Sequence, residues 1–356
     1  MTSPGQSPSM SRIRSSRVIV VRALAAFVLC GPMGCELTPK NEVPDAPVPP
    51  PPRPAVDVRR PTPEQAIRAE GGRDLIDAGS PEAAIKVFES LLDENPSLTV
   101  AYIGIGTAYE SMGEAVRAEP AFARAARLEP RNFEAQFGHG QALQALDRFR
   151  EALRAYQQAL VVEPDDTEAL SALAATFLEL DRARSAIAPA ERVVELSPDN
   201  GDAFAMLGTA YMLAGRTDEA IDTYEIAIEL IGNEPELIGN LIECYASEGR
   251  FQESVNAGQV LLSLAPSSPA WERQGRGFFR LGDYEASIDC YRRAVEIDSD
   301  YWPALNGIGV NALNTWLASD RSSVEARDEA AAAFRSSLRV NPDQPKVVRL
   351  LTTYGL

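Results

Sequence analysis

The chain has 356 residues, of which 45% are apolar and 24% are charged. This composition is typical of a globular protein with enough residues to build a sizeable core. The formal net charge of -17 at pH 7 disfavours nucleic acid and anionic lipid surfaces as partners and favours basic ones. A solvated acidic surface that serves only solubility would give the same charge.

The N-terminal segment predicts export. Its first residues include Arg12, Arg14 and Arg17 and no acid, and an uncharged apolar run from Ala23 to Gly34 follows. This order is typical of a signal peptide, which we place at residues 1–34. The run is shorter than the roughly 20 residues that cross a bilayer, so a permanent transmembrane helix is the weaker interpretation.

The end of this segment resembles the lipobox of bacterial lipoproteins. Gly34 precedes Cys35 as a small residue precedes the lipid-bearing cysteine of that group, although Pro32 stands where leucine is usual. Cys30 fits less well because the bulky Leu29 precedes it. The resemblance implies a lipid anchor on Cys35 and an exported protein that faces the periplasm from the inner or the outer membrane. Ordinary cleavage near Gly34 is the alternative.

Residues 35–63 are rich in proline. Proline fixes φ and lacks a backbone donor, so the segment favours extended polyproline II over a packed core. At about 3.1 Å per residue it could hold a folded domain up to roughly 80 Å from its anchor. We therefore predict a disordered stalk, with a PxxP ligand as the alternative.

A 34-residue period begins after the stalk. Pro96, Pro130, Pro164, Pro198 and Pro266 share one position of it, and Gly232 occupies the position between the last two. The same period holds Gly72, Gly106, Gly140, Gly208, Tyr109, Tyr211, Tyr245, Ala118, Ala152, Ala186, Ala220, Ala125, Ala159 and Ala227. These residues resemble the tetratricopeptide repeat. The resemblance implies an all-α solenoid, a superhelix of about eight helical hairpins in residues 64–356.

Helical spacing of apolar residues gives the hairpins. In one unit we predict a first helix from Asp202 to about Ala214, a break at Gly215, and a second helix that ends at Leu230. Gly208 and Ala220 are small because the two helices approach closely there. The predicted repeats are residues 65–98, 99–132, 133–166, 167–200, 201–234, 235–267, 268–301 and 302–344, followed by a C-terminal capping helix.

The eighth repeat carries about nine extra residues around Trp316. They either prolong the hairpin or form a loop folded over the end. We predict that Trp316 packs against the closing helix through Val348 and Leu351 and shields the last repeat. A protruding tryptophan that anchors a partner is the alternative.

The sequence gives no basis for catalysis. His139 is the only histidine, which leaves no second base for a triad and no zinc site of the usual kind. Cys244 and Cys290 lack the paired spacing of metal ligands, and we expect both to be buried free thiols. We therefore expect no enzyme activity, no metal and no cofactor.

The first helices of such repeats commonly line the concave groove. Ala69, Ile103 and Phe137 stand where some relatives place the lysine that clamps a C-terminal carboxylate, so tail binding of that type is not expected. The candidate groove is a mixed, mildly apolar strip. Its predicted residues are Ile103, Thr107, Phe137, Gln141, Ser171, Ala205, Thr209, Gly239, Asn240 and Glu243.

An acidic row recurs near the start of the first helices, at Glu134, Glu168, Asp202 and Glu236. It could grip a basic peptide. An acid in the first turn also complements the helix dipole, at about 0.3–1 kcal/mol without any partner. The sequence alone leaves both interpretations open.

The chain is therefore predicted to be a non-enzymatic scaffold that holds a peptide or protein segment in its groove, and a basic segment is one candidate. It resembles repeat lipoproteins of the bacterial envelope. This resemblance implies assembly of a pilus, a secretin or outer-membrane machinery. A regulatory or adaptor subunit for cell-wall-remodelling enzymes is the alternative.

Overall fold

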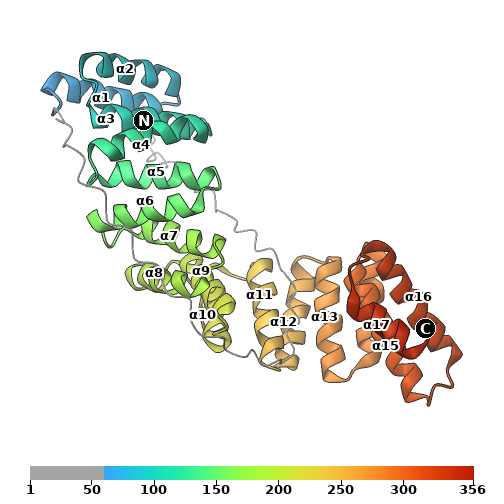
Figure 1. Cartoon of the computed structure of the whole chain (residues 1–356). Coiled ribbons are helices and arrows are strands. Elements are labelled where there is room, and N and C mark those ends of the chain that lie inside the picture. Colours follow the sequence, from blue (N-terminus) through green and yellow to red (C-terminus); the bar gives the residue numbers. More distant parts are fainter. Residues whose placement is uncertain (1–59) are drawn as a thin grey trace, which may run out of the picture. The chain divides into compact units, whose positions relative to one another are not determined.

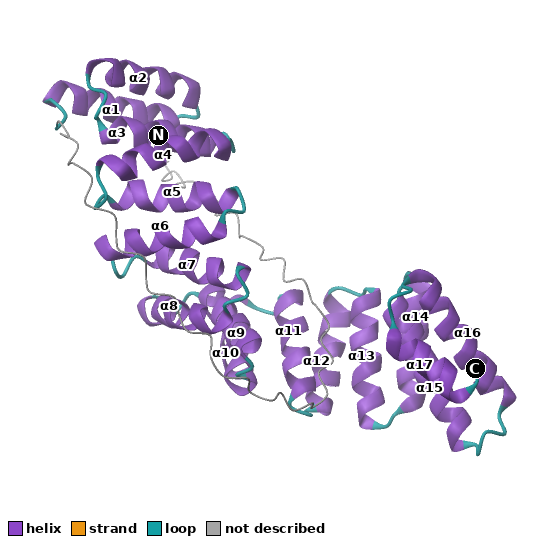
Figure 2. Cartoon of the chain, in the orientation of Figure 1, coloured by secondary structure: helices purple, strands orange, loops and turns teal. Residues whose placement is uncertain are grey.

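The computed structural model describes residues 60–356, which form seventeen α-helices and no strand (Figure 2). The predicted signal peptide, the lipidation site Cys35 and nearly all of the stalk lie outside this range. Within residues 60–356, every helix is too short or too polar to cross a membrane.

The helices pair into eight hairpins, and α17 closes the C-terminal end (Figure 1). The first helices are α1 (Pro63–Asp77), α3 (Thr99–Ser111), α5 (Phe133–Ala145), α7 (Thr167–Glu179), α9 (Gly201–Ala214), α11 (Pro235–Ser247), α13 (Ser268–Leu281) and α15 (Trp302–Ala318). The second helices are α2 (Pro81–Glu94), α4 (Ala115–Leu128), α6 (Phe149–Val162), α8 (Ala183–Leu196), α10 (Thr217–Ile231), α12 (Phe251–Leu264), α14 (Tyr284–Ile297) and α16 (Val324–Val340), and α17 is Pro345–Tyr354. The predicted all-α solenoid is confirmed.

Local sequence defines where the first helix begins. Thr62 accepts a hydrogen bond from the Gln65 amide, and the Gln65 side chain accepts one from the Thr62 amide, so the two form a capping box. Pro63 takes the first helical position, where its missing N–H costs nothing. Helix α1 therefore starts at Pro63, the last residue of the predicted stalk.

In six of the eight hairpins, an aromatic ring of the second helix packs against a glycine of a first helix. Phe122 of α4 lies between Gly106 of its own repeat and Gly138 of the next, and a Cβ on Gly106 would lie 2.8 Å from the ring. Phe88 lies in the same way against Gly72 and Gly104, and Tyr291 lies against Gly275 and Gly307. Glycine recurs at this position of the 34-residue period because no larger residue fits beside the ring.

Two repeats lack the ring. In the sixth repeat, other side chains fill the volume that the ring would occupy. Gly258 of α12 stands at the ring position of the sixth repeat. Ile242 takes the place of the glycine in the same repeat, and the Gln274 side chain lies where a Cβ of Gly258 would project. The exchange keeps the interior filled, as volume-conserving swaps in a packed core do.

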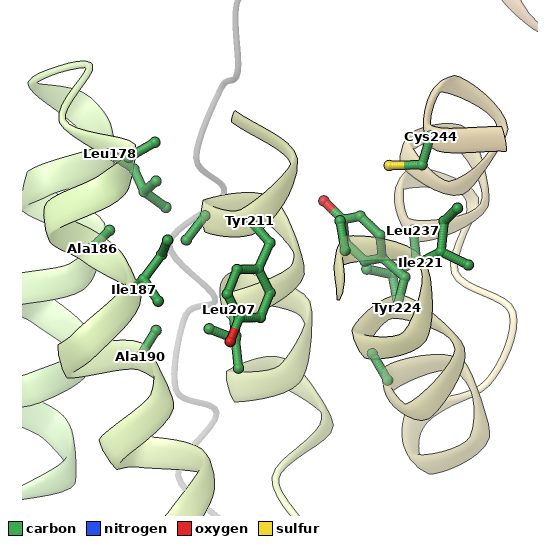
Figure 3. Packing of buried hydrophobic residues seen from close by; sticks show 14 of the residues in the cluster. Leu178, Ala186, Ile187, Ala190, Leu207, Tyr211, Ile221, Tyr224, Leu237 and Cys244 are labelled. Atoms are coloured by element: carbon green, nitrogen blue, oxygen red, sulfur yellow. The ribbon is translucent and has the colours of Figure 1, made fainter. Parts of the chain in front are cut away.

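The core continues from one repeat to the next. In the middle of the array, one cluster of buried side chains runs from Ala174 of α7 to Tyr245 of α11. Figure 3 shows Tyr224 and Ile221 of α10 beside Leu237 of α11. Each hairpin buries its apolar side against its neighbours, so stacking completes the core.

The extra residues of the eighth repeat prolong its hairpin. Helices α15 and α16 have 17 residues each, whereas α13 and α14 have 14. Trp316 is 7% exposed, lies in a cluster with Val347, and has Leu351 packed against that cluster. The predicted contact with Val348 is wrong, because that side chain is 47% exposed. The helical phase of α17 differs by one residue from the predicted one.

Candidate functional site

The first helices lie side by side along the array. Contacts join α1 to α3, α3 to α5 and so on to α15, whereas the second helices of successive repeats do not pack on one another in this way within residues 60–356. The first helices are therefore on the inner side of the stack. We call the accessible side of α3, α5, α7, α9 and α11 the first-helix face.

Five successive first helices carry charge of one sign only. Helices α3, α5, α7, α9 and α11 contain seven acids and no lysine or arginine, whereas α4, α6 and α8 each carry at least two arginines. The seven acids are Glu110, Glu134, Glu168, Glu179, Asp202, Glu236 and Glu243. The first-helix face therefore has a negative field. The second helix α10 is acidic as well, with five acids and no lysine or arginine.

Two of these acids are neutralised from neighbouring helices. Glu134 accepts from Arg73 of α1 at 3.1 Å, and Glu243 accepts from Arg273 at 3.1 Å and from Arg276 at 2.5 Å. The other five form no ion pair with any lysine or arginine in residues 60–356. The centre of the first-helix face therefore keeps its negative charge.

Glu110 has a pKa that is raised by its surroundings on this face. Its side chain is exposed, yet its pKa is raised to about 6, first by loss of hydration beside neighbouring protein and second by the Glu168 carboxylate. Helices α3 and α7 belong to alternate repeats, so carboxylates from two hairpins act on one place. Loss of hydration and a nearby like charge both disfavour the ionised form of Glu110.

This pKa predicts the effect of Glu110→Gln. Because the pKa is raised to about 6, the folded chain binds more protons than the unfolded chain between about pH 4.5 and 6, so stability falls as pH rises through that window. The variant should therefore gain up to about 1 kcal/mol at pH 7, after allowance for solvent screening, and nothing at pH 4. Urea denaturation at both pH values measures this. An equal gain in Glu179→Gln, or a loss in Glu110→Gln, contradicts it.

Two of the predicted groove residues are not accessible. Ile103 is 5% exposed and belongs to the cluster around Phe122, and Gly239 is buried below the Arg273 side chain. Both predictions are wrong as surface positions, because a neighbouring side chain fills the space in front of each. The remaining eight are half-buried: Thr107, Phe137, Gln141, Ser171, Ala205, Thr209, Asn240 and Glu243.

The polar members of that strip differ in availability. Ser171 donates to the Thr167 carbonyl at 2.7 Å, and Thr209 donates to the Ala205 carbonyl at 2.9 Å, so both hydroxyls are used locally. The side chains of Thr107 and Gln141 form no hydrogen bond within residues 60–356. These two can bond a partner without breaking an existing contact.

An aromatic platform lies beside them on α5. The rings of Phe133 and Phe137 stack with centroids 5.5 Å apart, and Phe137 lies 5.8 Å from Tyr156. Phe137 is half-buried, so part of its ring is exposed among the acids. Such a surface can take the aliphatic stem of a long cationic side chain.

All four acids of the predicted row are exposed in the first turns of α5, α7, α9 and α11. They are placed both to complement the helix dipoles and to face a ligand. Glu110 and Glu179, near the other ends of their helices, were missed by the sequence prediction. A count of charges helix by helix would have found them.

The acidic character ends at α13. Arg273 and Arg276 of this helix bind Glu243, and burial raises the pKa of Glu272, which lies 3.9 Å from Arg276. The next first helix, α15, contains no charged residue. The acidic part of the face therefore extends from α3 to α11.

His139, Cys244 and Cys290 are partly or fully buried. His139 is half-buried, with Nε2 3.5 Å from Glu119, and burial is the main cause that lowers its pKa. Cys244 and Cys290 are buried free thiols, as predicted, and burial raises their pKa values to about 12 and about 11. Residues 60–356 hold no group of three or more side chains arranged to bind a metal ion.

Family models identify the repeat. A model described as tetratricopeptide repeat matches residues 70–133, 137–200, 172–235 and 206–269, and a second model of that description matches residues 268–301. Together they cover more than half of the chain. The protein belongs to the tetratricopeptide repeat family. Proteins of this family bind protein or peptide partners and are generally non-catalytic scaffolds, so protein–protein interaction is the general function of this tetratricopeptide repeat protein.

Solved structures that are similar to this tetratricopeptide repeat protein have low sequence identity to it. The APC/C hetero-tetramer Cut9–Hcn1 is 17% identical with a TM-score of 0.48, and the match covers 77% of this chain and 52% of that one. Naa15/Naa10 bound to HypK-THB is 14% identical with a TM-score of 0.50, covering 81% and 44%. PilF of Pseudomonas aeruginosa is 17% identical with a TM-score of 0.49, covering 60% and 97%. None of the curated proteins compared with the chain matches it.

Proposed function

We propose that this protein is an exported, lipid-anchored scaffold that holds a basic segment of a partner protein on the first-helix face. The observation that carries the proposal is the charge of α3, α5, α7, α9 and α11, which contain seven acids and no lysine or arginine. Five of those acids have no basic partner in residues 60–356. These carboxylates repel one another, and a partner that supplies cationic side chains would neutralise them.

The composition of the face suits an extended polypeptide. Phe137 offers an aromatic surface, and Thr107 and Gln141 offer unused hydrogen-bonding groups to a passing backbone. Unpaired carboxylates speed the encounter with a cationic segment and add specificity against acidic ones. The predicted attraction is electrostatic and weakens with salt.

A pair of charge reversals tests the face. Glu168→Lys with Asp202→Lys should weaken binding of a labelled peptide of alternating arginine and alanine about tenfold or more at low salt, and less at high salt. The matched control is Asp222→Lys with Glu229→Lys, which makes the same change of net charge on the exposed side of α10. Fluorescence anisotropy measures both. Equal loss in the two variants contradicts a binding site on the first-helix face.

The envelope part of the proposal rests on residues 1–63. The lipobox resemblance at Cys35 and the proline-rich segment after it support a tethered protein that presents its repeats at a distance from a membrane. A scaffold in that position suits the assembly of an envelope complex such as a pilus, a secretin or outer-membrane machinery. The architecture is the support for this role.

Cys35→Ser tests the anchor. If Cys35 carries lipid, the variant loses the chain that holds it and should move from the membrane fraction to the soluble fraction. Cell fractionation followed by immunoblotting measures the partition, and Cys30→Ser is the matched control. The anchor is refuted if the Cys35 variant stays with the membranes as the parent does.

A further inference from the structure

The turn between α10 and α11 is the one turn between successive repeats in residues 60–356 with a positive-φ residue. It also lacks the proline that five other turns have, as does the turn between α14 and α15. Five turns place proline at this position, and here Gly232 stands in its place. Its backbone has φ 88° and ψ -175°, a region open essentially only to glycine. Proline restricts a turn, whereas glycine leaves many conformations accessible.

The start of α11 lacks the side-chain cap that α5, α7, α9 and α13 have, as do the starts of α3 and α15. The N-cap residue Glu234 forms no side-chain hydrogen bond with the first turn. The corresponding residues before α5, α7, α9 and α13 are Asn132, Asp166, Asn200 and Ser267, and each side chain caps its helix. A missing cap costs a helix start typically about 1 kcal/mol. The first turn of α11 can therefore rearrange at low cost.

Packing across this junction is reduced but continuous. Helices α10 and α11 share the least extensive contact of any two helices that join successive repeats in residues 60–356. Leu230 and Ile231, at the end of α10, stay exposed. Tyr224 and Leu237 nevertheless lie in one buried cluster that spans both helices (Figure 3). The two helices at the junction thus share a buried core, whereas the turn that joins them has few packing contacts.

We propose that the α10–α11 junction is a hinge about Gly232, on which α1–α10 and α11–α17 move as two bodies. Hinges of this kind need only a few residues that absorb a backbone change. Asp202 of α9 and Glu236 of α11 lie on opposite sides of the hinge, so its motion changes the spacing of the acids on the first-helix face. The hinge itself does not depend on what the face binds.

Distance distributions test the hinge in the full chain without any change to the turn. Spin-labelled amino acids at the exposed positions 188 and 256 span the α10–α11 junction, and the pair at exposed positions 154 and 222 spans the same number of repeats without crossing it. Electron double resonance should give a distribution on the order of twofold broader for the first pair. Equal widths overturn the proposal.

A second variant tests the cause. Gly232→Pro with Glu234→Asn rebuilds the Pro-x-Asn turn found at residues 198–200. The distribution between positions 188 and 256 should then narrow to the width of the control pair. A folded variant with the parent's width overturns the assignment to Gly232. If this variant fails to fold, the comparison of the two label pairs in the protein with its own turn still tests the hinge.

Discussion

Trp316→Ala is expected to lower the free energy of unfolding by about 3–5 kcal/mol, the usual cost of deleting a buried aromatic side chain. Trp316 packs in one cluster with Phe334 of α16 and Val347 of α17, and its ring centroid lies 6.5 Å from that of Tyr354. Its loss leaves a cavity under the closing helix and exposes the last repeat. Denaturant unfolding measures the change, and amide exchange should rise first in α15, α16 and α17.

The neighbouring Thr315 provides the control, because its side chain is exposed on the same helix. Thr315→Ala should change stability by less than about 0.5 kcal/mol. A Trp316→Ala protein that unfolds like the parent but no longer captures its partner would contradict the capping role. That result would make Trp316 an interface anchor instead.

Gly208→Leu is expected to destabilise the protein by about 3 kcal/mol, at the upper end for overpacking. A Cβ at Gly208 would already lie 2.8 Å from the Tyr224 ring, and that ring is fully buried, so it has little room to move. Ala220→Leu should behave in the same way because Ala220 is fully buried. Thermal and denaturant unfolding of both variants measures the effect.

Gly71 offers a matched control for the glycine substitution. It lies inside α1, and nothing is found within 4 Å of a Cβ built there. Leucine at Gly71 should be neutral or stabilise the protein by up to about 1 kcal/mol through helix propensity. Equal destabilisation at Gly71 and Gly208 would show that the cost comes from losing glycine in a helix and not from the Tyr224 contact.

The ladder of small residues made the fold predictable. Gly106 and Gly208 recur because a ring of the second helix fills the space beside each. This pairing of a small residue with a ring repeats with the 34-residue period, so the sequence shows it. The phase of α17 was not predictable from one short helix outside the period, where Val347 and Val348 are equally apolar. The sixth repeat replaces its ring by Gly258 and Gln274, a pairing that only contact across two helices reveals.

The candidate site was predictable in charge but not in detail. The acidic row is visible in the spacing of Glu134 and Glu168, but the ion pair of Glu134 with Arg73 joins residues 61 positions apart. Ile103 and Gly239 occupy groove positions of the ladder, yet neighbouring side chains cover them. The pKa of Glu110 is raised first by loss of hydration and second by the Glu168 carboxylate, two hairpins away. Such long-range contacts depend on how repeats stack and not on the period.

The most direct test of the central claim is crosslinking in cells from defined positions. A photoreactive amino acid at Gln141, on the first-helix face, and a second one at Gln158, on the exposed side of α6, sample the two sides of the array. Mass spectrometry then identifies the attached peptides. We predict that Gln141 captures a segment rich in lysine and arginine, that Gln158 does not, and that Glu168→Lys with Asp202→Lys abolishes the capture. Capture from Gln158 alone, or of an acidic or uncharged segment from Gln141, would contradict the account.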